Sequence, residues 1–497
     1  MNSIKQLAGQ TVVYGMGTIV PRVLNYALLT PFYSRIFSLG EYGVVTEIYA
    51  YMAILLILLT YGMETAFFRF TALGEYNKEK VYFSSLISLL ATSLGFILLS
   101  ILFSDSIADF LQYSGNRDYI IMFSLIVGID AFSALPFARL RIENRIYKFA
   151  MIKIINVLVI VTVALAFLYF IPKHIDKNNH SVLEKIYSNE IGVGYVFIAN
   201  LCGSLVTLIL LLPQILKTRY VFSKTILKKI LRYALPLLIA GMAGVVIETF
   251  DKASLKFLLP NREIALDQLG IYGANFKIAV LMGLFIQMFR YAAEPFFFTR
   301  AKDKNARHLY ARVMNYFVLF CLLIFLFINF NINVFKHLVP EQYWIGLNVV
   351  PIILAAFVFY GIFVNLSIWY KLNDLTRYGA VITIIGATLT IVINIVFVPV
   401  YGYTASAWAH FISYLVMIFI SYLWGRKIYK VSYDLKKISI YIVLTFIIYL
   451  IVSQLNFSSL FSELIIGNSI LILFFVAIYY FEIRNKLTEF EANEKLK

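Results

Sequence analysis

The chain has 497 residues, of which 61% are hydrophobic and 14% are charged. Its mean hydropathy of +0.82 lies outside the range of soluble domains and excludes a soluble enzyme or binding module. Continuous apolar runs of about 20 residues, the length that crosses a bilayer as a helix, recur along the whole chain. They do not alternate in the short segments of a membrane barrel, so the sequence predicts an all-α polytopic membrane protein.

We predict about fourteen membrane spans from these runs. In chain order they are 9–33, 42–68, 81–104, 119–138, 149–171, 191–213, 234–257, 268–298, 310–335, 345–370, 378–398, 403–425, 438–455 and 463–481. The first is expected to be a retained signal-anchor, because the polar N-terminus carries no small-residue cleavage pattern. Every loop is too short for a folded domain, so we expect the function to lie within the bilayer.

The formal charge of +16 follows the topology of the spans. About 30 Lys and Arg residues fall in the loops on the N-terminal side and about 8 in the others, which is the positive-inside asymmetry. The main basic segments are 139–148, 217–232 and 426–437. The charge therefore predicts cytoplasmic termini and no nucleic-acid partner, with a phosphoinositide or nucleic-acid patch as the alternative for the middle segment.

The pentapeptide LGEYG at 39–43 returns 230 positions later as LGIYG at 269–273. Residues 39–68 align with 269–298 without a gap, with ten identities in thirty positions. The offset covers an even number of spans, so the two copies are predicted to be parallel repeats with a substrate path between them. We expect the pentapeptide to form the same outside turn in each copy, with Gly40 and Gly43 allowing a tight reversal and close helix approach.

The predicted organisation therefore has four parts. They are an N-terminal six-helix lobe (1–214), a cytoplasmic basic linker (215–233), a C-terminal six-helix lobe (234–425), and two extra C-terminal helices with a cytoplasmic tail (426–497).

Placing an ionisable side chain inside a membrane span costs free energy, so such residues are candidate functional positions. Arg22 lies on a polar stripe of the first span with Thr11, Tyr14, Thr18, Asn25 and Tyr33. Its repeat equivalent is Lys252, and the eighth span adds Lys277 and Arg290. With Asn25 and Tyr26, these four basic residues form the candidate substrate site, and Arg and Lys there suit a phosphate group.

The acidic residues inside the spans suggest a second role. Glu248 is spaced to pair with Lys252, which would leave Asp251 for proton or cation coupling, and Asp130 is a further candidate, so Asp130, Glu248 and Asp251 form the ion-coupling set. Glu64 and Glu294 occupy equivalent positions near basic loops and are expected to form ion pairs at helix ends. Whether the substrate is anionic or cationic stays open, because the sequence does not tell which charges face inward.

Signatures of enzymes are missing from the sequence. There is no H-E-x-x-H, P-loop or G-x-S-x-G motif, and no pair of His or Cys residues has metal-ligand spacing. We therefore expect no catalytic residue, no cofactor and no metal.

One stretch is similar to a known family. Residues 35–70, RIFSLGEYGVVTEIYAYMAILLILLTYGMETAFFRF, resemble the signature region of bacterial polysaccharide biosynthesis transporters. These are the flippases of O-antigen and capsule repeat units in the multidrug/oligosaccharidyl-lipid/polysaccharide (MOP) superfamily, which is related to the MATE transporters. The resemblance extends in layout to nearly the whole chain.

The resemblance implies an inner-membrane flippase that moves undecaprenyl-pyrophosphate-linked oligosaccharides to the periplasmic leaflet for surface polysaccharide synthesis. It implies a pyrophosphate held by the cationic residues named above, and a polysaccharide polymerase and a chain-length regulator as partners. The alternatives are a cation-coupled MATE-type multidrug exporter, which would use acids such as Asp130 or Asp251, and a lipid II flippase. A polymerase or acyltransferase is disfavoured, since it would need a large outside loop or a His/Asp pair.

Overall fold

Helices make up almost all of the described chain and follow the predicted hydropathic order. The computed structural model describes residues 20–72, 76–175, 187–218, 221–301, 303, 305–373, 375–455, 457 and 459–495. Within those ranges there is no β-strand, as expected for an all-α membrane protein. In the described part of the chain, thirteen helices are long and apolar enough to cross a membrane, and each corresponds to one predicted span after the first.

The first predicted span, 9–33, is described only from residue 20, where a helix runs to residue 36. Its first half, with Thr11, Tyr14 and Thr18, lies outside the described residues, so the count of fourteen stays a prediction.

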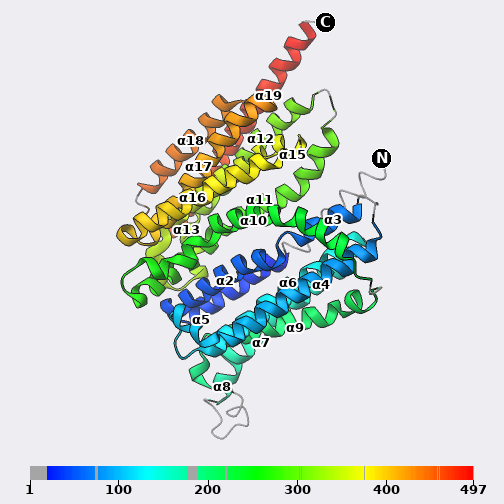
Figure 1. Ribbon diagram of the computed structural model, residues 1–497. Helices are drawn as coiled ribbons and strands as arrows, with labels where there is room; N and C mark the ends of the chain where they lie inside the picture. The colour runs from blue at the N-terminus through cyan, green and yellow to red at the C-terminus, as the bar shows by residue number, and fades with distance from the viewer. Residues whose placement is uncertain are drawn as a thin grey trace.

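The helices form two lobes, which lie one above the other in Figure 1. The N-terminal lobe contains the helix over 20–36, α2 (Leu39–Thr60), α3 (Met63–Ala72), α4 (Lys78–Leu102), α5 (Ser104–Phe110), α6 (Arg117–Ile142), α7 (Ile146–Leu165), a π-helical turn (Ala166–Phe170), α8 (Ile171–Ile175), a 3-10 turn (Asn189–Ile191) and α9 (Gly194–Leu216). The C-terminal lobe contains α10 (Lys224–Leu258), α11 (Arg262–Arg300), α12 (Ala306–Phe330), α13 (Ile332–Phe335), two 3-10 helices (Lys336–Leu338 and Glu341–Val349), α14 (Val350–Leu366), α15 (Ile368–Leu372), α16 (Thr376–Tyr401) and α17 (Tyr403–Ile428).

Two further helices, α18 (Leu435–Ser453) and α19 (Leu460–Lys495), pack on α12 at the outer side of the C-terminal lobe (Figure 1). Polar side chains fix this contact. Asn331 and Asn468 exchange amide hydrogen bonds of 3.1 and 3.0 Å, and the Asn333 amide donates to both Glu463 oxygens at 2.7 Å. Such bonds stabilise helix pairs in apolar surroundings, where no water competes.

The two lobes have the same orientation, as the even offset predicted. They meet along α2 and α11, where Gly40 lies against Asp267 and Gly43 against Gly270. Further along, Thr46 of α2 lies against Gly273 of α11, so the contacts advance in step along both helices. The equivalent second helices of the two lobes are therefore parallel.

The repeated pentapeptide holds the lobes together. A Cβ atom on Gly43 would clash with the backbone carbonyl of Leu266, and one on Gly270 would clash with that of Leu39. Only glycine allows the two helix backbones to come this close. We call this end of the bundle, where the helix over 20–36 passes into α2, the Ser38 end, and the opposite end the Glu64 end.

The expectation that the pentapeptide forms a turn in both copies is wrong. Residues 39–43 form the first turn of α2, which Ser38 and Glu41 cap with a reciprocal capping box. Residues 269–273 lie inside α11, because Asn261 caps that helix earlier by accepting from the Glu263 and Ile264 amides. What the two copies share is the contact between helices, and not a reversal of the chain.

Replacing Gly43 by Ala is therefore expected to lower the free energy of unfolding by about 1–3 kcal/mol, since the added methyl group forces α2 away from the α11 backbone. Gly95 in α4 is the matched control, because a Cβ there meets nothing within 4 Å. Gly95→Ala should be neutral or stabilise by up to about 1 kcal/mol through helix propensity. Denaturation of both purified variants in detergent checks this, and equal effects would contradict it.

The duplication is also visible in two ion pairs near the Glu64 end. In the N-terminal lobe Glu64 pairs with Arg141, and in the C-terminal lobe Glu294 pairs with Lys371 at 2.6 Å. Both members of the second pair lie 230 positions after those of the first. The prediction that Glu64 and Glu294 form ion pairs is confirmed.

Candidate functional site

A cavity of about 680 Å³ lies between the lobes, within the usual size range of small-molecule sites. Its walls come from the helix over 20–36 and α2 of the N-terminal lobe, and from α10, α11, α14 and α17 of the C-terminal lobe. The glycine contact between α2 and α11 brings its walls together at the Ser38 end. The cavity thus lies at the seam of the duplication.

All six residues of the candidate substrate site line this cavity. They are Arg22, Asn25, Tyr26, Lys252, Lys277 and Arg290. Among the described residues of the lining, these four basic side chains are accompanied by one acidic side chain, that of Glu248. His410 also lines the cavity. The cavity is therefore net positive, which the sequence alone left open.

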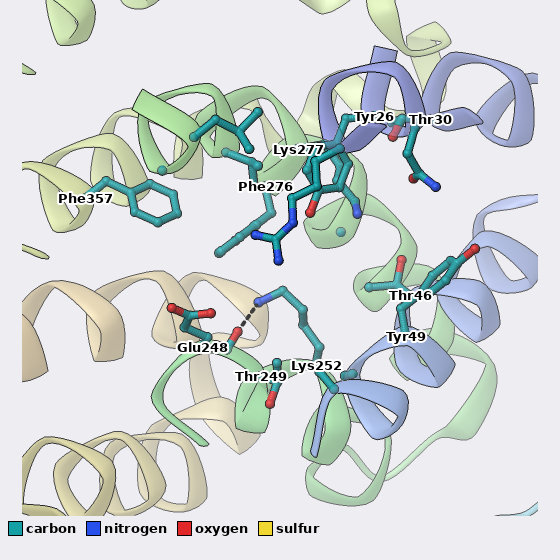
Figure 2. Close-up of a pocket in the computed structure, with 18 of the residues that line it drawn as sticks. Tyr26, Thr30, Thr46, Tyr49, Glu248, Thr249, Lys252, Phe276, Lys277 and Phe357 are labelled. Atoms are coloured by element: carbon teal, nitrogen blue, oxygen red, sulfur yellow. Dashed lines mark hydrogen bonds between the residues drawn. The ribbon is translucent and has the colours of Figure 1, made fainter. Parts of the chain in front are cut away.

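The four cations come from both lobes and approach one another across the seam. Figure 2 shows Lys252 extending from α10 toward the space below Lys277, which comes from α11. The Lys277 ammonium lies 4.4 Å from the centre of the Tyr26 ring, and the Arg22 guanidinium donates to Gln287 Oε1 at 2.8 Å. Each of these contacts joins the N-terminal helix to α11 of the other lobe.

The predicted pair between Glu248 and Lys252 is wrong. Lys252 Nζ lies 3.1 Å from both carboxylate oxygens of Asp251 and donates to the backbone oxygen of Glu248 at 3.0 Å (Figure 2). The Lys252 side chain folds back onto the neighbouring carboxylate, so Asp251 is the paired acid. The Glu248 carboxylate remains on the cavity wall.

Asp251 is fully buried behind the wall and holds a polar cluster within the C-terminal lobe. Its carboxylate accepts from Tyr272 Oη at 2.6 Å and lies 2.9 Å from His410 Nε2. Because His410 and Lys252 both line the cavity, Asp251 orients two basic groups that face it.

The other intramembrane charges do not line the cavity. Asp130 and Lys153 belong to α6 and α7, where the Lys153 ammonium lies 4.1 Å from the Phe137 ring centre. Glu64 and Glu294 form the ion pairs described above.

The sequence did not predict a buried ion pair that joins the two lobes. Lys256 of α10 pairs with Glu47 of α2 at 2.8 Å, and both side chains are fully buried. Lys256 Nζ also donates to Leu111 O at 2.6 Å, while Tyr51 and Tyr113 donate to the Glu47 carboxylate. Burial and the Glu47 charge raise the pKa of Tyr113, in the loop before α6, well above its ordinary value, so its hydroxyl keeps the proton it donates.

The sequence matches a family model, and the fold matches solved structures. The sequence matches the model of the polysaccharide biosynthesis protein family over residues 7–299. The structure is similar to that of the lipid II flippase MurJ in an inward closed conformation, with TM-score 0.72 and 15% identity, covering 96% of this chain and 100% of that one. An outward-facing multidrug resistance MATE transporter of the MOP superfamily aligns with TM-score 0.59 and 16% identity over 88% of this chain and 96% of its own.

A MATE structure in complex with MaD3S gives TM-score 0.60 and 14% identity, over 88% of this chain and 96% of that one. At these identities the likenesses show the fold alone. Among curated proteins, none matches the sequence of this chain.

Two parallel helical lobes with a cavity at their seam define a multi-pass membrane protein with the fold seen in MurJ and the MATE transporters. The family match covers more than half of the 497 residues. The chain therefore belongs to the polysaccharide biosynthesis protein family.

Proposed function

We propose that this protein is a flippase that moves undecaprenyl-pyrophosphate-linked oligosaccharide repeat units from the cytoplasmic to the periplasmic leaflet. The units would serve surface polysaccharide synthesis, such as O-antigen, capsule or exopolysaccharide. The two lobes would rock about their seam so that the cavity faces each side in turn.

The net positive lining of the cavity is the observation that carries this proposal. Four basic side chains face one acid across a space surrounded by apolar helices. In a low-dielectric site of this kind an anionic group such as pyrophosphate gains charge-assisted hydrogen bonds that replace its lost hydration. An organic cation would meet net repulsion there.

The chemistry of the cargo fits a seam between lobes. A glycosylated pyrophosphate is too polar to cross hydrocarbon, and its polyprenyl tail is too apolar to leave it. A cavity between two lobes can hold the head group while the tail remains in lipid. The Ser38 end would then be the periplasmic end, with both termini in the cytoplasm and the protein in the inner membrane.

The ion-coupling residues remain part of the proposal. Glu248 faces the cavity directly, whereas Asp251 acts on it only through Lys252 and His410. Asp130 lies away from the cavity, in the N-terminal lobe. Glu248 is therefore the best placed of the three to exchange a proton or cation as the cavity changes sides.

Deletion of the gene tests the proposal. We expect loss of surface polysaccharide and accumulation of lipid-linked repeat units, both restored by the wild-type gene. Unchanged polysaccharide without such accumulation would contradict it. Hypersensitivity to drugs, with loss of efflux in Asp251→Asn, would instead indicate the multidrug exporter, and arrested peptidoglycan synthesis would indicate a lipid II flippase. A polymerase and a chain-length regulator are the proposed partners downstream.

A further inference from the structure

One wall of the cavity carries the same side-chain pattern on two helices. Tyr26, Thr30 and Tyr33 stand at i, i+4 and i+7 on the helix over 20–36, and Tyr42, Thr46 and Tyr49 repeat that spacing on α2. All six line the cavity. We call this set the tyrosine wall. The spacing places each triad on one face of its helix.

The fold does not require this wall. On α11, the equivalent of α2, the positions 230 residues later carry Tyr272, Phe276 and Ala279. The second copy thus builds the equivalent of α2 while keeping one tyrosine of the two and losing the threonine. Because the pattern is present in only one of the two copies, it indicates a function of the cavity face of that copy.

The tyrosine wall is neutral and rich in hydroxyl groups. Tyr33 is 2% exposed, and its hydroxyl has no hydrogen-bond partner among the described residues. The Tyr49 hydroxyl accepts a hydrogen bond of 3.1 Å from the Asn200 amide, which lies outside the cavity lining. Of the two acids adjacent to the tyrosine wall in sequence, Glu41 caps α2 and Glu47 pairs with Lys256. A buried hydroxyl without a partner costs about 1–3 kcal/mol unless a bound molecule satisfies it.

The wall lies directly beside the cationic side of the cavity. Figure 2 shows Tyr26 and Thr30 on one helix and Thr46 and Tyr49 on the next, with Lys277 beside Tyr26 and Lys252 facing them from below. The Lys277 ammonium is 4.4 Å from the Tyr26 ring centre. A group attached to a phosphate held by Lys277 is therefore within reach of the wall.

We propose that the tyrosine wall is a sugar subsite, which takes the first uncharged sugar ring of the lipid-linked cargo. A pyranose offers an apolar C–H face that packs on tyrosine rings and a rim of hydroxyls that pairs with tyrosine and threonine hydroxyls. The cations would bind the diphosphate common to all such lipids, and the wall would separate glycosylated from bare carriers. This inference rests on the proposed function.

Binding by the full-length protein in nanodiscs tests the subsite. The two probes are undecaprenyl pyrophosphate and the same lipid carrying one N-acetylhexosamine. We expect the wild type to bind the glycosylated probe at least about tenfold more tightly, as one or two satisfied hydrogen bonds allow. Tyr33→Phe and Tyr42→Phe should each reduce this preference severalfold while changing affinity for the bare lipid less than about twofold.

Tyr61→Phe is the matched control, because Tyr61 is a buried tyrosine of the same lobe that bonds Ser88 outside the cavity. It should leave the preference unchanged, and thermal unfolding verifies that all variants fold. Equal wild-type affinity for both probes, or tyrosine variants that weaken both alike, would overturn the subsite and leave the proposed function standing. Binding of neither probe by the wild type would overturn the proposed function as well.

Discussion

Replacing Lys256 by Met, with Glu47 left in place, is expected to lower the free energy of unfolding by about 3–5 kcal/mol. The Glu47 carboxylate is fully buried between the lobes and would lose its only countercharge among the described residues. The hydroxyls of Tyr51 and Tyr113 would remain, but they carry no charge to balance it. Denaturant unfolding of the purified protein in mixed micelles measures the loss.

The double variant Glu47→Gln/Lys256→Met distinguishes the electrostatic contribution of the ion pair from the contribution of side-chain packing. The amide oxygen introduced at position 47 can still accept from one tyrosine, and no charge is left buried, so most of the lost stability should return. If the double variant is as unstable as Lys256→Met, the loss comes from packing and the electrostatic explanation is wrong. Because the pair joins α2 to α10 across the seam, both variants should also favour separation of the lobes at the Ser38 end.

Removing two cavity cations is expected to abolish transport. Each of Arg22→Ala and Lys252→Ala should weaken binding of a diphosphate head group by about 10- to 150-fold, the usual value of a charge-assisted hydrogen bond of about 1.5–3 kcal/mol. Both side chains reach the cavity surface, and the buried Asp251 carboxylate, which loses Lys252, keeps His410 and Tyr272 as partners. Thermal unfolding of the variant verifies that it folds. Restoration of surface polysaccharide in a deletion strain measures the effect.

Lys371→Gln is the control for charge removal, because Lys371 pairs with Glu294 away from the cavity and both are partly exposed. Such pairs contribute about 0–1 kcal/mol, so near wild-type polysaccharide is expected. Full activity of the Arg22→Ala/Lys252→Ala protein would show that the positive lining does not bind the cargo.

Most of the fold could be predicted from the sequence, because the hydropathy pattern and the internal repeat are both properties of the linear sequence. The offset that aligns Leu39 with Leu269 also predicted the parallel lobes and the equivalent positions of Glu64 and Glu294. The polar stripe around Arg22 and Asn25 correctly indicated a helix face on the cavity.

What the sequence did not predict depends on which neighbour a side chain meets in space. Spacing favoured Glu248 as the partner of Lys252, yet Asp251 holds it because the two side chains turn to the same side of α10. Glu47 and Lys256 are 209 positions apart, so only their assembled lobes bring them together. Lys256 lies one helical turn after Lys252, which was the one signal that could have drawn attention to it.

The sign of the cavity charge could not be predicted from the sequence for the same reason. The sequence contains similar numbers of intramembrane acids and bases, and only the structure separates those that face the cavity from those paired elsewhere.

Flipping of a fluorescent undecaprenyl-pyrophosphate-linked oligosaccharide in proteoliposomes tests the central claim most directly. Access of a glycosidase added outside reports which leaflet holds the sugar. We predict that the wild type equilibrates the labelled lipid between leaflets, that Arg22→Ala/Lys252→Ala does not, and that Lys371→Gln does. Equal flipping by the wild type and the Arg22→Ala/Lys252→Ala protein, or none by the wild type under conditions where it transports an organic cation, would contradict an anion-binding seam between the two lobes.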